Sequence, residues 1–303
     1  MKILFGIRPT SKSIHIGHIS ILKELSKFVN ENSNLSDSFD IYIFIAHYHA
    51  LTTGLDIEKS ERYKNFSEYG YFLFTQAVKT IKYYLDDEVK NKVNIIMIPQ
   101  YRNFKILDTF VKLLNITSYS EITSIPTLKE YKKNLKKNEY LSAGFINYPI
   151  LQAADIISIN PDYIFVGKDQ LPNLKILKKL IRKYNSVYNE KINEDIKIIA
   201  TENVIPGYDG RKMSKSYNNV INIDDEDVVI KDKISIYPTD GHRKGEKGDF
   251  NKCMFYHLCK GILKDNTVKE IENYCSNNNS LCKICKEKFG EEIFYLIDSL
   301  RWF

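Results

Sequence analysis

The first eighteen residues, MKILFGIRPTSKSIHIGH, constrain the fold more than any other stretch of the chain. Lys2 to Ile7 is an apolar run that predicts a short buried strand, and the Pro9 turn ends it. Small polar residues follow, and then HIGHISILKELSKFV repeats its apolar residues every three or four positions, which predicts a helix. The sequence therefore predicts a strand, a tight turn and a helix N-terminus in direct succession.

A helix N-terminus after such a turn is suited to binding an anion. Its free N–H groups and the positive end of its dipole face outward. His15 and His18 add hydrogen-bond donors, and Gly17 between them leaves backbone that a flat ring or a phosphate can approach. From these residues alone, a pair of core histidines is the alternative.

A second basic segment lies about two hundred residues downstream, in GYDGRKMSKSYNN from Gly207 to Asn219. Its glycines allow the loop to move. Lys212 and Lys215 supply point charges that suit a polyphosphate, and Ser214 lies between them. The alternative is an ordinary solvated basic loop.

Strand and helix patterns alternate through the first two hundred residues. This alternation predicts an α/β fold with a doubly wound, Rossmann-like parallel sheet. After Ile221 the pattern is helical, so we expect a second, helical domain. The further expected strands are Ile41–Ala46, Val93–Ile98, Tyr163–Val166 and Lys197–Ala200, and the further expected helices are 58–84, 104–114, 140–157, 169–182 and 224–234.

Length and charge narrow the class of protein. The 303 residues favour two domains, which we predict at 1–190, completed by the loop region 196–220, and at 221–303. A net charge of +6 favours a polyanionic partner. No apolar run approaches the ~20 residues that cross a membrane, and the first residues show no signal-peptide pattern, so we expect a cytoplasmic protein.

Polar residues that could bind a ligand lie after a predicted strand and on a predicted helix. His47 and His49 come directly after the Ile41–Ala46 strand. Tyr148, Gln152 and Asp155 are spaced to share one helix face, where Asp155 could accept a hydrogen bond from an aromatic ligand. A solvent-facing or helix-terminal aspartate is the alternative, as an N-cap role is for Asp169 in VGKDQ.

The two basic motifs occur together with further blocks in a recognisable order. HIGH and KMSKS resemble the signatures of class I aminoacyl-tRNA synthetases. FGIRPT, AHYHALTT, IPTLKEYK, LSAGFINYPILQAADI, VGKDQ and PGYDGRKMSKSYNN resemble, in this order, blocks of the tryptophan–tRNA ligases. The resemblance runs from Lys2 to about Cys285. The ALTT sequence and the set of cysteines favour the tryptophan branch of the family over the related tyrosine branch.

The resemblance implies roles for particular residues. In the family, the residue matching Asp155 receives the indole N–H, while the histidines and lysines of the two motifs bind the phosphates of ATP. The implied catalytic residues are His15, His18, Lys212 and Lys215. The implied ATP site is Arg8, Thr10, His15, Gly17, His18, Gly167, Asp169, Lys212, Met213, Ser214 and Lys215. The implied tryptophan site is Phe5, Gly6, His49, Tyr148, Gln152, Asp155 and Gln170.

Four positions depart from the family pattern. They are Ser11, His47, Lys168 and Asn173, and they leave the geometry around the nucleotide open.

All five cysteines follow residue 250, which suits a metal site better than a disulfide framework in an ATP-using enzyme. Cys253, Cys275, Cys282 and Cys285 have the spacing C-x21-C-x6-C-x2-C, leaving Cys259 outside the set. Four thiolates can hold zinc or an iron–sulfur cluster, and free buried thiols are a third possibility. The spacing resembles that of tryptophan–tRNA ligases that carry a 4Fe–4S cluster, with one residue fewer in the first gap.

The resemblance thus implies an ATP- and Mg²⁺-dependent ligase for L-tryptophan and tRNA(Trp) that acts as a homodimer. A tyrosine–tRNA ligase is the nearer alternative. A small nucleotidyltransferase sharing the HIGH turn and a non-catalytic RNA-binding relative are the farther ones.

Overall fold

In the computed structural model, the chain forms two compact units. Unit 1 comprises Met1–Lys12, Asn32–Phe74 and Glu88–Ala200, and unit 2 comprises Ser13–Glu31, Thr75–Asp87 and Thr201–Phe303. The structure describes residues 1–52, 56–134, 141–201, 205–211, 213, 217–242, 246–277 and 282–301. The functional domains expected at 1–190 with 196–220 and at 221–303 follow other bounds and stay a prediction.

The sheet has five strands in the order β3-β2-β1-β4-β5, in which β1 lies at the centre. The strands are β1 (Lys2–Ile7), β2 (Phe39–Ile45), β3 (Val93–Pro99), β4 (Tyr163–Gly167) and β5 (Lys197–Thr201). β1 pairs in parallel with both β2 and β4, and β2 pairs in parallel with β3. This is the 3-2-1-4-5 portion of the 3-2-1-4-5-6 strand order of a doubly wound fold, so the predicted fold class is confirmed.

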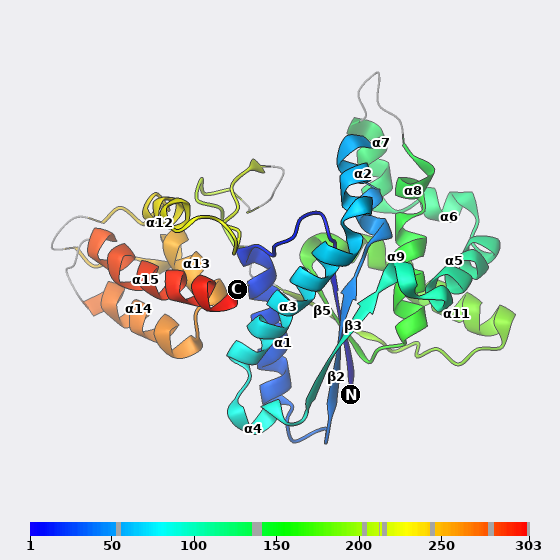
Figure 1. Ribbon diagram of the computed structural model, residues 1–303, viewed down its shortest axis with the longest axis horizontal. Coiled ribbons are helices and arrows are strands. Elements are labelled where there is room, and N and C mark those ends of the chain that lie inside the picture. The colour runs from blue at the N-terminus through cyan, green and yellow to red at the C-terminus, as the bar shows by residue number, and fades with distance from the viewer. Residues whose placement is uncertain are drawn as a thin grey trace. The chain divides into compact units, whose positions relative to one another are not determined.

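Three helices share a hydrophobic core with the sheet in unit 1. They are α5 (Phe104–Ile116), α9 (Tyr148–Ile159) and α11 (Leu177–Tyr188). Their buried side chains, such as Leu113 and Ile150, form one cluster with Leu4 of β1 and Ile164 of β4. Figure 1 shows the three helices beside one another in green. The core therefore fixes α9, which carries the predicted ligand residues, relative to the sheet.

Three expected helices are interrupted. The pattern at 58–84 forms α2 (Asp56–Lys64) and α3 (Phe66–Tyr84), with the break at Asn65. The 140–157 pattern forms α8 (Ala143–Ile146) and α9, because Pro149 fits only the first turn of a new helix.

The third interruption has the same cause. Pro172 lies in the first turn of α10 (Leu171–Leu174), so a new helix begins after the 3-10 helix η3 (Lys168–Gln170). The rest of the 169–182 pattern forms α11.

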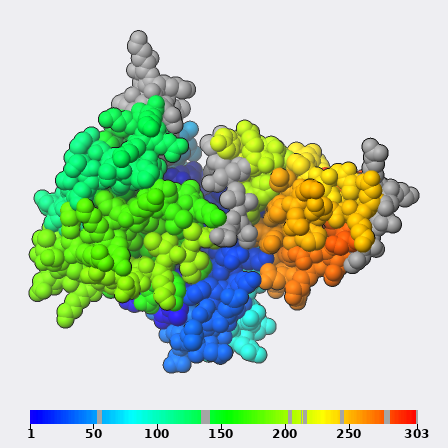
Figure 2. Space-filling view, turned by 180° about the vertical axis from the view of Figure 1, so that it is seen from behind, coloured from blue at the N-terminus to red at the C-terminus, as the bar shows by residue number. Residues whose placement is uncertain are grey.

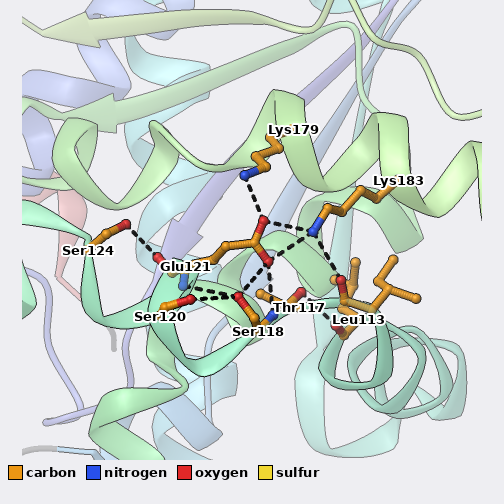
Figure 3. A network of polar contacts seen from close by, with 9 residues as sticks. Leu113, Thr117, Ser118, Ser120, Glu121, Ser124, Lys179 and Lys183 are labelled. Carbon is orange, nitrogen blue, oxygen red and sulfur yellow. Dashed lines mark hydrogen bonds and ion pairs between the residues drawn. The ribbon is translucent and has the colours of Figure 1, made fainter.

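Unit 1 also contains α6 (Tyr119–Thr123) and α7 (Pro126–Asn134), and α4 (Asp87–Lys90) precedes β3. A capping box formed by Ser118 and Glu121 begins α6. The Glu121 carboxylate also accepts from Lys179, at 2.6 Å, and from Lys183, at 2.7 and 2.9 Å, both on α11 (Figure 3). These lysines hold the pKa of Glu121 well below its usual range. The network ties the start of α6 to α11.

Unit 2 joins α1 to the C-terminal helices. It contains α1 (Ile16–Glu31), the part of α3 from Thr75 onward, α12 (Asp227–Ser235), α13 (Met254–Ile262), α14 (Asp265–Asn277) and α15 (Cys282–Leu300). The surface of the last three is orange to red in Figure 2. The ammonium group of Lys23 on α1 is buried, and it donates to the carbonyl oxygens of Lys260 (3.0 Å) and Leu263 (2.5 Å). It also pairs with Asp265 at 3.0 Å, so its charge and its three donors are all satisfied.

Among the residues that the structure describes, no helix has both the length and the apolar character needed to cross a membrane.

Candidate functional site

The carboxyl ends of the parallel strands bring several polar residues to one edge of the sheet. Arg8 follows β1, His47 follows β2 and Gln100 follows β3. Ligands of open α/β sheets bind at this edge. The predicted tryptophan-site residues all lie in unit 1 and fall at this edge or on α9, which is packed against the sheet.

Asp155 is the buried acceptor at this edge. Its side chain is only 5% exposed, and the segment around it on α9 is buried. His49 Nε2 lies 2.8 Å from Oδ2, and Gln100 Nε2 donates to Oδ1 at 2.9 Å. Burial raises the pKa of Asp155, and these two hydrogen bonds oppose the rise. Each carboxylate oxygen can accept a second hydrogen bond, so Asp155 can still accept one from a ligand N–H.

Two polar atoms beside Asp155 are buried and have no protein partner. They are His49 Nδ1 and Gln152 Oε1. Because a buried polar atom without a partner costs free energy, such atoms are usually satisfied by a ligand or by water. Their position next to the aspartate favours a polar ligand here.

A polar chain continues from α9 toward η3. Tyr148 Oη and Gln152 Nε2 each lie 3.4 Å from Gln170 Oε1, and Gln170 Nε2 donates to Asp169 at 2.8 Å. The Tyr148 ring also contacts the ring of His49, with centroids 4.3 Å apart. Burial raises the pKa of Tyr148. The predicted residues on α9 and at the β4–α10 turn therefore do form one connected group.

Other predicted residues of unit 1 line β1 and the turn after it. Phe5 is buried in β1, whereas Gly6 and Arg8 are exposed. A Cβ at Gly6 would come no closer than 4.0 Å to its nearest neighbour, so the structure does not itself demand glycine there. Thr10 N donates to the Arg8 carbonyl at 2.9 Å, which closes the turn.

The HIGH residues lie in unit 2, at the beginning of α1. The rings of His15 and His18 are 4.0 Å apart between centroids, and Gly17 N donates to His15 Nδ1 at 3.1 Å. A Cβ at position 17 would lie 2.8 Å from the His15 ring, so glycine is needed for the ring to fold over the helix start. Access for a ligand, the role expected of this glycine, stays a prediction.

The residues just after the Gly207–Asn219 segment are hydrogen-bonded to the HIGH segment. Ile16 N donates to the Ile221 carbonyl at 3.1 Å, and Ile223 N donates to the Ile14 carbonyl at 3.2 Å. His15 and Asn222 thereby form an antiparallel bridge. Residues 221–223, which follow the second basic motif in the chain, therefore pair with the HIGH segment within unit 2.

Asp209 organises the beginning of the same segment. It accepts from Arg211 at 2.8 Å and from Asn219 Nδ2 at 2.7 Å, and these bonds lower its pKa. Met213 is buried, and its N–H donates to the Ile205 carbonyl at 3.0 Å. The predicted Lys212, Ser214 and Lys215 lie outside the described residues.

The four cysteines of the predicted metal set gather in unit 2 around the start of α15. Cys253 is buried at the N-cap of α13, where its sulfur accepts from Tyr256 N at 3.4 Å. Burial and the neighbouring sulfurs raise the pKa of Cys275 to about 11 and that of Cys285 to about 12. Thiolates are ligands of zinc and of iron–sulfur clusters, and a bound cation would offset these raised pKa values. Among the described residues, the ligand atoms of Asp240, His242 and Cys282 lie within 4.8 Å of one another.

Cys259 is completely buried, and its pKa is also raised, first by burial. It stays outside the predicted set.

His47 is a buried core residue. Its Nε2 lies 3.2 Å from the Phe66 carbonyl, and the rings of Phe66 and Tyr101 pack around it. Its Nδ1 is buried without a partner, and burial lowers its pKa to about 4. His47 is one of the four positions that depart from the family pattern, and it is therefore buried here as a neutral imidazole.

We expect His47 to make the protein acid-sensitive. Below pH ~6.5 the unfolded chain binds a proton at this position, whereas the folded chain does so only near pH 4, so stability falls as pH drops through this window. The loss reaches about 3 kcal/mol, taking ~1.4 kcal/mol for each unit of the pKa difference. Urea unfolding at pH 7.5 and 4.5 should show a smaller pH dependence in His47→Gln than in wild type. In His257→Gln, the matched control, the dependence should be that of wild type, and equal dependence in all three proteins would contradict the expectation.

Three residues of these groups were not predicted. Gln100, in the 3-10 helix η2 (Gln100–Arg102), bridges Tyr48 N and Asp155, and its position directly after a predicted strand was the available signal. Asp240 and His242 contact Cys282. Only their Asp-Gly-His sequence, shortly before Cys253, could have indicated them.

The strand order and the acceptor at the carboxyl edge of the sheet define the class as a doubly wound, Rossmann-like α/β protein. Comparison with known families makes the assignment specific. The model of the family described as "tRNA synthetases class I (W and Y)" matches residues 1–296. The chain therefore belongs to this family of class I tRNA synthetases.

Relatives agree with this assignment. The chain is 30% identical over 292 residues to the tryptophan–tRNA ligase of Thermotoga maritima, covering 95% of this chain and 83% of that one. It is 31% identical over 299 residues to that of Clostridium longisporum, covering 96% and 82%.

Solved structures share the fold. The tryptophanyl-tRNA synthetase of Campylobacter jejuni, complexed with ADP and tryptophan, has a TM-score of 0.71 at 24% identity, covering 99% of this chain and 87% of that one. The tyrosyl-tRNA synthetase of Archaeoglobus fulgidus has a TM-score of 0.63 at 17% identity, covering 99% and 89%. The family match spans the helical C-terminal residues as well, which disfavours a small nucleotidyltransferase.

Proposed function

We propose that this chain activates L-tryptophan with ATP and transfers it to tRNA(Trp). The tryptophan carboxylate attacks the α-phosphorus of ATP, the bond to the β-phosphate breaks, and pyrophosphate leaves. The terminal ribose hydroxyl of the tRNA then attacks the carbonyl carbon of the adenylate and releases AMP. The observation that carries the proposal is the buried carboxylate of Asp155, held by His49 and Gln100 at the ligand-binding edge of the sheet.

The proposed binding roles follow from the charge and polarity of the residues. Asp155 accepts the indole N–H, and Tyr148, Gln152 and Gln170 bind the remaining polar groups of the amino acid. Phe5, Gly6 and His49 line the pocket. ATP is bound by Arg8, Thr10, Gly167 and Asp169 together with the HIGH and KMSKS residues, of which the histidines and lysines bind the phosphates. Catalysis here is positioning and charge stabilisation, helped by Mg²⁺, with no covalent intermediate on the protein.

Pyrophosphate exchange tests the proposal directly. Purified protein is incubated with ATP, Mg²⁺ and labelled pyrophosphate, and either tryptophan or tyrosine is added. Tryptophan should drive the exchange and tyrosine should not. Exchange driven by tyrosine would assign the other branch of the family, and a lack of exchange with either amino acid would overturn the proposal, as expected of a non-catalytic RNA-binding relative.

We also propose that residues 221–303 contribute to anticodon binding and that the protein is cytoplasmic. Within this region, Cys253, Cys275, Cys282 and Cys285 bind a metal centre, for which the resemblance favours a 4Fe–4S cluster over zinc. The cluster would serve as a structural centre held by four thiolates. A brown protein containing about four iron and four sulfide per chain would support it, whereas a colourless protein with zinc would refute it.

The proposed homodimer has a candidate surface on α5. Phe104, Leu107 and Val111 are 86%, 55% and 49% exposed on one side of this helix, and Ile106 and Leu113 are buried on the other. Leu107 also lines a cavity of about 450 Å³ beside Gln100. An apolar helix face exposed next to an apolar cavity favours a contact with a second copy.

A charge on this face should separate the subunits. We expect wild-type protein to have the mass of a dimer in light scattering and Leu107→Glu to have that of a monomer. Val187→Glu is the matched control, because Val187 is 59% exposed on α11, and it should remain a dimer. A wild-type monomer, or a dimeric Leu107→Glu, would argue against this surface.

A further inference from the structure

Two residues that are not cysteines lie against the proposed metal centre. His242 Nδ1 is 3.4 Å from the sulfur of Cys282, and Asp240 Oδ1 is 3.3 Å from the same sulfur. The imidazole and the carboxylate are also in contact, with Nδ1 at 2.9 and 3.0 Å from the two oxygens. Asp240, His242 and Cys282 therefore form a compact triad of three different donor types.

The surroundings fix the imidazole in this position. The side chains of His242 and Asp240 are only 9% and 4% exposed. Asp240 Oδ2 also accepts from Asp249 N at 2.6 Å, which anchors the carboxylate. A Cβ at Gly248 would lie 3.0 Å from His242 Cε1 and 2.4 Å from Cys275 Sγ, so glycine there leaves room for both the ring and the sulfur.

Metal binding changes the electrostatics of this triad. Cys282 must lose its proton to become a ligand, and its sulfur then carries a negative charge 3.3 Å from the Asp240 carboxylate. Two adjacent anions repel each other unless a donor lies between them. The ring N–H of His242 is within reach of both, and hydrogen bonds to ligand sulfurs are one of the protein's means of tuning a cluster.

We propose that His242 shares its Nδ1–H between the Asp240 carboxylate and the sulfur of Cys282 in the metal-loaded protein, and that this shared hydrogen bond secures the proposed 4Fe–4S cluster. This proposal rests on the cluster of the proposed function. His242 is a positioning residue in it and not a ligand. By stabilising negative charge on the sulfur, its N–H also makes the cluster easier to reduce.

The test compares His242→Leu, which removes the donor, with His242→Asn, whose side-chain N–H can take the same place. Asp240→Asn tests the orientation of the ring, and His257→Leu is the matched control because His257 contacts the Asn251 carbonyl instead. Each full-length protein is reconstituted anaerobically with iron and sulfide. Iron loss to a ferrous chelator is then timed, and the midpoint potential is measured by titration with dithionite.

We expect His242→Leu to lose iron about tenfold faster than wild type and to have a more negative midpoint potential. His242→Asn should recover most of both properties, Asp240→Asn should lie between, and His257→Leu should match wild type. Equal rates and potentials in wild type and His242→Leu would overturn the proposal. Binding of one zinc without iron, lost in both Asp240→Asn and His242→Leu, would also overturn it by making these residues ligands.

Failure of the cluster itself is recognised separately. A wild-type protein that remains colourless after reconstitution removes both the cluster and the role of His242. Tryptophan-dependent pyrophosphate exchange in that same colourless protein would leave the proposed enzymatic function standing.

Discussion

Replacing Asp155 with asparagine should lower kcat/KM for tryptophan in pyrophosphate exchange by about 100-fold or more. Asp155 Oδ2 faces His49 Nε2 and Oδ1 faces the Gln100 amide, so both oxygens accept. An asparagine must turn its NH₂ group toward one of these partners, and it no longer offers a charged acceptor to the indole N–H. Loss of a hydrogen bond to a charged group costs ~1.5–3 kcal/mol, or about ten- to 150-fold, and the displaced partner adds to this.

The measurement is the tryptophan dependence of the exchange rate at saturating ATP, with the KM for ATP as an internal reference that should stay unchanged. Asp195→Asn is the matched control, because Asp195 is 90% exposed in an ion pair with Lys178. Urea unfolding of both variants shows whether they fold. A folded Asp155→Asn enzyme that activates tryptophan within twofold of wild type would remove Asp155 from the recognition of the indole.

Lys215→Ala should slow formation of the adenylate by about 100-fold or more and leave tryptophan binding almost unchanged. The proposed role of Lys215 is to neutralise the charge that develops on departing pyrophosphate, and loss of one such preorganised group typically costs ~10²–10³ in rate. Lys215 lies outside the described residues. The segments on both sides of it are anchored, however, by Asp209 before it and by the bridge between His15 and Asn222 after it.

Single-turnover formation of labelled tryptophanyl-adenylate gives the rate, and equilibrium dialysis with labelled tryptophan gives the affinity. Lys252→Ala is the matched control, since Lys252 is 78% exposed near α13, and it should match wild type in both measurements. A normal rate in Lys215→Ala would mean that the KMSKS lysine does not act on the phosphates.

The sequence predicted the framework of this protein well, because long apolar runs and their alternation depend on local chemistry. The five strands lie within two residues of their expected bounds, and β1 matches them at both ends. Interrupted helices were harder, since Pro149 and Pro172 break an apolar pattern that is otherwise continuous. The spacing of the apolar residues continues across these prolines. It therefore does not show that proline, which lacks a backbone N–H, cannot lie inside a helix.

The sequence predicted those site residues that lie close together in the chain, and it missed those that meet only through long-range contacts. Asp155, Gln152 and Tyr148 share a helix face, and their spacing is visible in the sequence. Gln100 directly follows β3, in η2, and bonds to Asp155 on α9, fifty-five residues later in the chain, so this contact is a long-range property of the fold. His242 likewise meets Cys282 forty residues later in the chain. The proposed roles of the site residues stay predictions until the variants above are measured.

The buried ammonium of Lys23 has a consequence for how this enzyme can be shortened. It fastens the helix that begins with the HIGH histidines to the last carbonyls of α13 and to the first residue of α14. A chain cut after residue 221 would keep both signature motifs and yet expose an unpaired charge and the apolar flank of α1. The C-terminal helices thus hold the helix that carries the HIGH motif in place. Their removal should impair amino-acid activation as well as tRNA charging.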